Sequence, residues 1–68
     1  MNIERLVQMA NDIAAFFAAE PDRAEAAAGV AAHLKRFWEP RMRQAIRAHA
    51  DAGGDGLSEL AREGVRRM

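Results

Sequence analysis

The sequence predicts an all-α fold, a small bundle of three main helices followed by a short C-terminal helix. Alanine, the strongest helix former, supplies 16 of the 68 residues. β-branched residues are scarce and never alternate with polar ones, as they would in a strand. Apolar residues instead recur every three or four positions, in segments separated by proline or glycine. We therefore expect one helical domain over residues 1–68, with helices at about 3–19, 22–38, 40–52 and 57–67.

The first segment, 3–19, has an unusually wide apolar face. Asn2 is a suitable N-cap. Met9 and Phe16 widen the apolar arc to about 180°, where a surface helix needs roughly 100°. Such a helix contacts two neighbours, which are either two helices of this chain or one helix and a second chain. The central stripe of this face consists of Ile3, Leu6, Ala10, Ile13, Ala14 and Phe17.

The second segment, 22–38, follows a break at Pro21. Asp22 and Glu25 have the spacing of a capping box at its start. Gly29 lies in its interior, where glycine costs about 1 kcal/mol relative to alanine. Either another part of the backbone approaches closely at this point or a strong helical context tolerates the glycine. The apolar face consists of Ala27, Val30, Ala31, Leu34, Phe37 and Trp38.

Two shorter helices complete the predicted bundle. Pro40 suits the first position of the third helix. Gly53 can take the left-handed geometry that ends it, and two further glycines by position 56 make a flexible connection. Ser58, the single serine, is expected to cap the last helix.

The residue types that most enzymes need are missing or scattered. The chain has no cysteine, and its two histidines, His33 and His49, lie in different predicted helices without carboxylates at metal-ligand spacing. The connection Gly53–Gly56 lacks the lysine and hydroxyl residue of a phosphate loop. We therefore expect no catalytic residue, no metal site and no cofactor in this chain. With no signal peptide pattern and no apolar run of about 20 residues, we expect a cytoplasmic protein without membrane contact.

A basic cluster extends from Lys35 to Arg47 and has two interpretations. Its arginines could contact nucleic-acid phosphates. Alternatively they could surround Phe37 and Trp38 as the rim of a surface that docks on an acidic protein. The net charge of zero and the pI of about 6.7 favour the protein partner, because nucleic-acid binders are usually basic overall.

Three stretches carry a resemblance to a known family. They are Ile3–Phe17, Gly29–Arg43 and Gly53–Leu57, of which the part from His33 to Met42 is the most specific. Together they resemble the delta subunit of cytoplasmic, NAD-dependent, molybdenum-containing formate dehydrogenases, over nearly the whole chain.

The resemblance implies a non-catalytic accessory subunit that assembles with, or stabilises, a formate dehydrogenase complex. In that family the catalytic partner subunits carry molybdenum-pterin and iron–sulfur clusters, and other subunits pass electrons through FMN to NAD. An assembly chaperone for the catalytic molybdenum subunit is the main alternative, and a small nucleic-acid-binding regulator is a third.

The candidate partner interface combines the resemblance with the apolar pattern. Phe37 and Trp38 could equally belong to the core. Since only 18 apolar residues are larger than alanine, we expect the isolated chain to be marginally stable or self-associated. The candidate interface residues are Phe37, Trp38, Pro40, Arg41, Met42, Met9 and Phe16.

Overall fold

Four α-helices follow one another along the chain, and there is no strand. The computed structural model describes residues 1–68. Three helices of 12 to 15 residues precede one of nine, which confirms the predicted fold class. The helices are α1 (Ile3–Phe17), α2 (Arg23–Phe37), α3 (Pro40–Asp51) and α4 (Glu59–Arg67).

The predicted helix ends agree with the structure to within two residues. The largest differences are at α1, which ends at Phe17 instead of Ala19, and at α4, which begins at Glu59 instead of Leu57. At α1 the residue after Phe17, Ala18, is the C-cap, and at α4 Ser58 is an extended N-cap with φ −66° and ψ 161°, so the helix cannot begin before Glu59. Such ends are usually uncertain by one or two residues.

Side-chain caps start three of the helices. Asn2, Asp22 and Ser58 each accept hydrogen bonds from backbone N–H groups of the following turn, as the sequence predicts. The capping box at α2 is only half formed. The N–H of Asp22 donates to the carboxylate of Glu20 at 3.1 Å, and not to Glu25.

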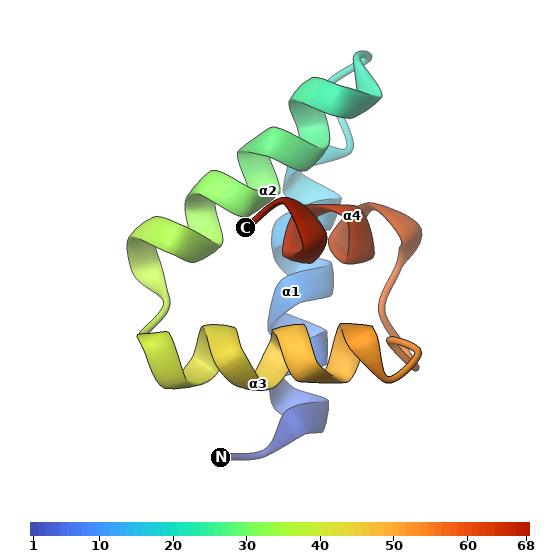
Figure 1. Cartoon of the computed structure of the whole chain (residues 1–68). Helices are drawn as coiled ribbons and strands as arrows, with labels where there is room; N and C mark the ends of the chain where they lie inside the picture. Colours follow the sequence, from blue (N-terminus) through green and yellow to red (C-terminus); the bar gives the residue numbers. More distant parts are fainter.

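The four helices surround a core that is rich in alanine. In Figure 1, α3 runs across α1, and α4 is seen above α3, with its turns side by side. The most extensive contact between helices joins α2 and α4. Seven of the fifteen buried hydrophobic residues are alanines. The larger buried side chains are Leu6, Val30, Leu34, Trp38, Ile46, Leu57, Leu60 and Val65.

A clamp on α1 holds the connection between α3 and α4. The side-chain amide of Asn11 donates to the carbonyl oxygen of Gly56 and accepts from the N–H of Ser58, both at 2.9 Å. Gly53, Gly54 and Gly56 have positive φ, so the chain can turn sharply here. The helical pattern alone places Asn11 on the polar side of α1, whereas the structure makes it a half-buried link between distant segments.

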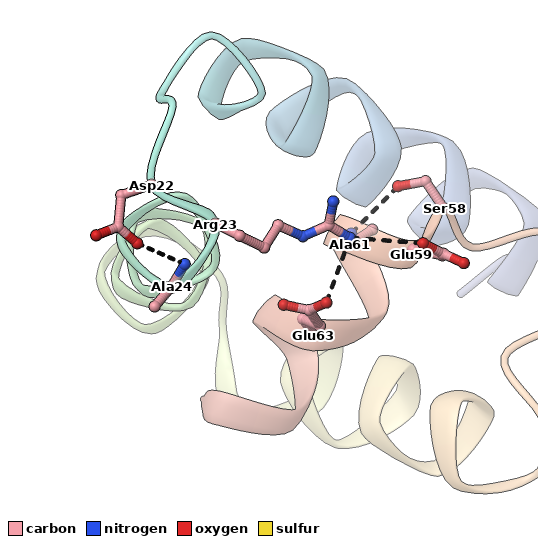
Figure 2. A network of polar contacts seen from close by, with 7 residues as sticks. All are labelled: Asp22, Arg23, Ala24, Ser58, Glu59, Ala61 and Glu63. Carbon is pink, nitrogen blue, oxygen red and sulfur yellow. Dashed lines mark hydrogen bonds and ion pairs between the residues drawn. The ribbon is translucent and has the colours of Figure 1, made fainter.

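An ion-pair bridge connects the start of α2 with α4. The guanidinium of Arg23 lies 3.3 Å from a carboxylate oxygen of Glu63 and 3.8 Å from one of Glu59 (Figure 2). Because these side chains are 43% to 90% exposed, such pairs contribute at most about 1 kcal/mol each. The bridge therefore orients the helix ends more than it stabilises the bundle.

Candidate interaction surface

Aromatic rings form a continuous row over α1 and α2. Phe16 and Phe37 are the most exposed aromatic side chains, at 77% and 65%. The Phe16 and Phe17 ring centroids are 5.1 Å apart, those of Phe17 and His33 6.5 Å, and those of His33 and Phe37 4.7 Å. We call these four residues the aromatic row. Edge and tilted contacts of this kind hold rings in defined positions.

A shallow groove borders the row. A second hollow at the Phe16 end shares Asp12, Ile13 and His33 with the groove, so the two are continuous. We call the row and this groove together the aromatic face. The groove is lined by Met9, Asp12, Ile13, His33, Phe37, Trp38 and Met42.

The structure brings most of the predicted interface residues to the aromatic face. Met9, Phe37 and Met42 line the groove, and Phe16 lines the adjoining hollow. The rings of Phe16 and Phe37 are therefore two ends of one surface, although 21 positions separate them in the sequence.

Trp38 belongs mainly to the core. Its side chain is only 6% exposed, and the small remainder reaches the groove. Its carbonyl oxygen accepts a 2.7 Å hydrogen bond from Nη1 of Arg43, which also donates to the carbonyl of Lys35 at 3.1 Å. Arg43 thereby fixes the corner between α2 and α3, a role that the sequence pattern did not reveal.

Pro40 and Arg41 lie apart from the aromatic face. Pro40 begins α3 and lines a different hollow, together with Lys35 and Arg43. Arg41 is exposed at the start of α3 and lines none of the described hollows. The structure therefore places Pro40 at a different hollow and Arg41 outside both surfaces.

The basic cluster is divided in the same way. The guanidinium of Arg36 lies 5.5 Å from the centroid of the Phe37 ring, at the edge of the aromatic face. Lys35, Arg43 and Arg47 line the other hollow. Of these four basic residues, only Arg36 therefore lies beside an aromatic ring of the aromatic face, and Lys35, Arg43 and Arg47 lie at the other hollow.

Both histidines make contacts within the fold. His33 is half-buried between Phe17 and Phe37, and Nε2 of His49 donates to the carbonyl oxygen of Asp55 at 2.7 Å. No group of three or more histidine or carboxylate side chains is arranged to hold a metal ion. None of the four helices has the length and apolar character needed to cross a membrane.

Comparison with known proteins gave one match. The model of the family described as NADH-dependant formate dehydrogenase delta subunit FdsD matches residues 5–65 of the 68-residue chain. The comparisons with curated proteins and with solved structures gave no match. The matched range includes both ends of the aromatic row and the corner between α2 and α3.

Proposed function

The chain belongs to the NADH-dependent formate dehydrogenase delta subunit family, and we propose that it is a non-catalytic accessory subunit that stabilises such a complex. In this proposal the molybdenum-pterin, iron–sulfur clusters, FMN and NAD are held by partner subunits, and the complex works in the cytoplasm. This chain contributes a docking surface.

The aromatic face is the observation that carries the proposal. Phe16 and Phe37 remain 77% and 65% exposed although the chain is short of large residues for its own core. Burial of an aromatic side chain removes roughly 150–250 Å² of surface from water, and aromatic residues including phenylalanine are enriched in interfaces. Covering this face with a partner subunit would therefore stabilise both proteins.

Affinity purification of the tagged chain from its native cells tests the proposal. We expect the catalytic subunits at fixed stoichiometry, with formate-dependent NAD reduction in the eluate. The double variant Phe16→Ala/Phe37→Ala should reduce the recovered complex at least tenfold. Its own folding should be retained, because alanine favours helices and both side chains are exposed.

A matched control separates docking from a general effect of mutation. Glu4→Ala/Gln8→Ala changes two exposed residues of α1 outside the described hollows and should leave recovery unchanged. Recovery of only an inactive large subunit would replace the accessory role with that of an assembly chaperone. Absence of every formate dehydrogenase subunit from the wild-type eluate would overturn the proposal.

A further inference from the structure

A second, positively charged hollow lies where the C-terminal part of α2, the helix α3 and the end of the chain meet. It differs in composition from the aromatic face, since one methionine and one proline accompany mainly polar and cationic side chains. Positions two apart on a helix point in nearly opposite directions, which places Lys35 away from His33 and Phe37. We call this site the basic hollow; its lining is Lys35, Pro40, Arg43, Gln44, Arg47 and Met68.

Lys35 and Arg43 of the basic hollow have no carboxylate partner within the chain, whereas Arg47 contacts an oxygen of the last residue, Met68. The ion pairs of the molecule are those of Arg23 with Glu59 and Glu63. A neighbouring depression shares Lys35 and adds Arg67, so the positive charge continues onto α4. Although the chain has ten basic and ten acidic residues, no ion pair joins Lys35, Arg43 or Arg67 to an acidic side chain. A bound anion would relieve the repulsion among these cations.

Backbone hydrogen bonds hold two of the cations in place. Arg43 donates through Nη1 to the carbonyls of Lys35 and Trp38, and Arg47 donates through Nη2 to the backbone oxygen of Met68. Each guanidinium has five N–H donors, so both retain donors for a ligand. Planar, oriented guanidinium groups match carboxylates well, and less freedom is lost when they bind.

We propose that the basic hollow binds an acidic segment of a partner polypeptide. Arg43 and Arg47 are one helical turn apart, with roughly 5–6 Å between their Cβ atoms. Alternate side chains of an extended peptide are separated by roughly 7 Å. An extended segment with Asp or Glu at positions i and i+2 can therefore place one carboxylate on each arginine, with Lys35 beside them.

A polypeptide fits this site better than a nucleic acid does. The chain as a whole is neutral, with a pI of about 6.7. The phosphates of a nucleic acid would also be repelled by the acidic residues of the chain. The inference extends the proposed function, on which it rests for the expectation that the acidic segment belongs to the formate dehydrogenase complex. The chain would then contact the complex at two places, through the aromatic face and through the basic hollow.

Site-specific photocrosslinking tests the inference in the full chain within its native cells. Gln44 lines the basic hollow and would be replaced by p-benzoylphenylalanine, with the same replacement of the exposed Gln8 on α1 as the control. Mass spectrometry of the Gln44 product should identify a segment of another protein with at least two acidic residues at alternate positions. Cross-links to nucleic acid, to non-acidic segments only, or to nothing would overturn the inference.

Charge reversal in the basic hollow provides a second test of the inference. Lys35→Glu/Arg47→Glu should reduce the Gln44 cross-link at least tenfold, while Arg5→Glu, a reversal on an exposed residue outside the hollow, should not change it. If circular dichroism shows that the reversed chain is unfolded, the neutral pair Lys35→Gln/Arg47→Gln should give the same loss. An unchanged cross-link in a folded variant would contradict the proposal.

The results distinguish this inference from the proposed function. Cross-linking to an acidic segment of an unrelated protein, without formate dehydrogenase subunits in the eluate, would retain the basic hollow and reject the accessory role. Recovery of the complete enzyme without an acidic cross-link at Gln44 would retain the accessory role and reject the basic hollow as a binding site.

Discussion

At the residue scale, Phe37 and Trp38 are neighbours in sequence with opposite environments. Trp38 ends α2 with its ring in the core, whereas Phe37 remains 65% exposed beside His33 and Arg36. The chain leaves helical geometry at Trp38, which has φ −89° and ψ 141°, but Trp38 lies four positions after the buried Leu34 and so continues the buried face of α2. The sequence allowed both residues to be core or interface, and only the packing of the other helices separates them.

We expect Trp38→Ala and Phe37→Ala to have different effects on stability. Removing the buried indole should lower the free energy of unfolding by about 3–5 kcal/mol, as for other large-to-small core substitutions. Phe37→Ala should cost less than about 1 kcal/mol because most of its ring is already in water. Urea denaturation followed by circular dichroism measures both values.

The amount of recovered complex should fall in both variants, but for different reasons. Phe37→Ala should remain folded yet recover less formate dehydrogenase, whereas the loss with Trp38→Ala should follow its loss of folded protein. A Trp38→Ala chain that is as stable as the wild type would contradict the position of the indole in the core.

Some residue roles could not be predicted from the sequence, for a physical reason. Asn11 has its partners 45 and 47 positions away, and a helical pattern contains no information about which loop will reach it. Phe16 could be selected because it widens the apolar arc of its helix, and Phe37 because it lies in the stretch that carries the family resemblance. Lys35 and Arg36 looked alike because both point away from the core, and only the positions of α3 and α4 decide which surface each one joins.

At the scale of elements, the contact between α2 and α4 depends on a glycine. A Cβ at Gly64 would lie 2.3 Å from Cγ1 of Val30 and 2.6 Å from its Cβ, so the two helices approach more closely than alanine allows. Gly29 has a related role, since a Cβ there would lie 2.5 Å from the ring of Phe17. The glycine inside α2 is therefore approached by a side chain, and not by the backbone as the sequence suggested.

We expect Gly64→Ala to destabilise the chain although alanine is the better helix former. Overpacking of a dense contact typically costs about 1–3 kcal/mol, which exceeds the gain of about 1 kcal/mol in helix propensity. Thermal unfolding followed by circular dichroism should show a lower melting temperature.

A double-mutant cycle with Val30→Ala tests whether contact with Val30 causes the destabilisation by Gly64→Ala. Gly64→Ala should cost less in the Val30→Ala background, because the methyl groups that it meets have been removed. Equal costs in the two backgrounds would show that the contact between Gly64 and Val30 is not responsible.

The Asn11 clamp gives a prediction for the connection between α3 and α4. Asn11→Ala removes the donor to Gly56 and the acceptor for Ser58, and should lower the free energy of unfolding by about 1–3 kcal/mol. Amide hydrogen exchange should accelerate mainly in residues 53–58. Asn11→Asp keeps an acceptor for Ser58 but loses the donor, so an intermediate effect is expected; unchanged exchange in both variants would argue against the clamp.

The helices themselves were the most predictable part of the fold. Asn2, Asp22, Pro40 and Ser58 occupy the starting positions that their side chains favour, because capping and proline geometry are local properties. The extensive pairing of α2 with α4 was not predictable, since alanine-rich faces offer several helices similar surfaces. The Gly64 contact selects one of these arrangements.

At the scale of the whole molecule, the few large apolar side chains are divided between the core and the aromatic face. Seven of fifteen buried hydrophobic residues are alanines, while Phe16 and Phe37 remain at the surface. Burial of apolar surface contributes roughly 25 cal/mol per Å², so alanine adds little and the exposed rings add almost nothing until they are covered. The isolated chain should therefore be less stable than the same chain in its complex.

We expect the isolated chain to unfold at low urea concentration or to self-associate through the aromatic face. A partner that binds only the folded state stabilises it by about 2.7 kcal/mol at a hundredfold excess over its dissociation constant. Sedimentation over a range of concentrations, with thermal melts at each, measures both association and stability.

If self-association is present, Phe16→Ala/Phe37→Ala should shift the chain to monomers. Its melting temperature at low concentration should not fall, because both rings are exposed in the monomer. A wild-type monomer that melts cooperatively at high temperature would show that this alanine-rich core is sufficient by itself, and the need for a partner would then rest on function and not on stability.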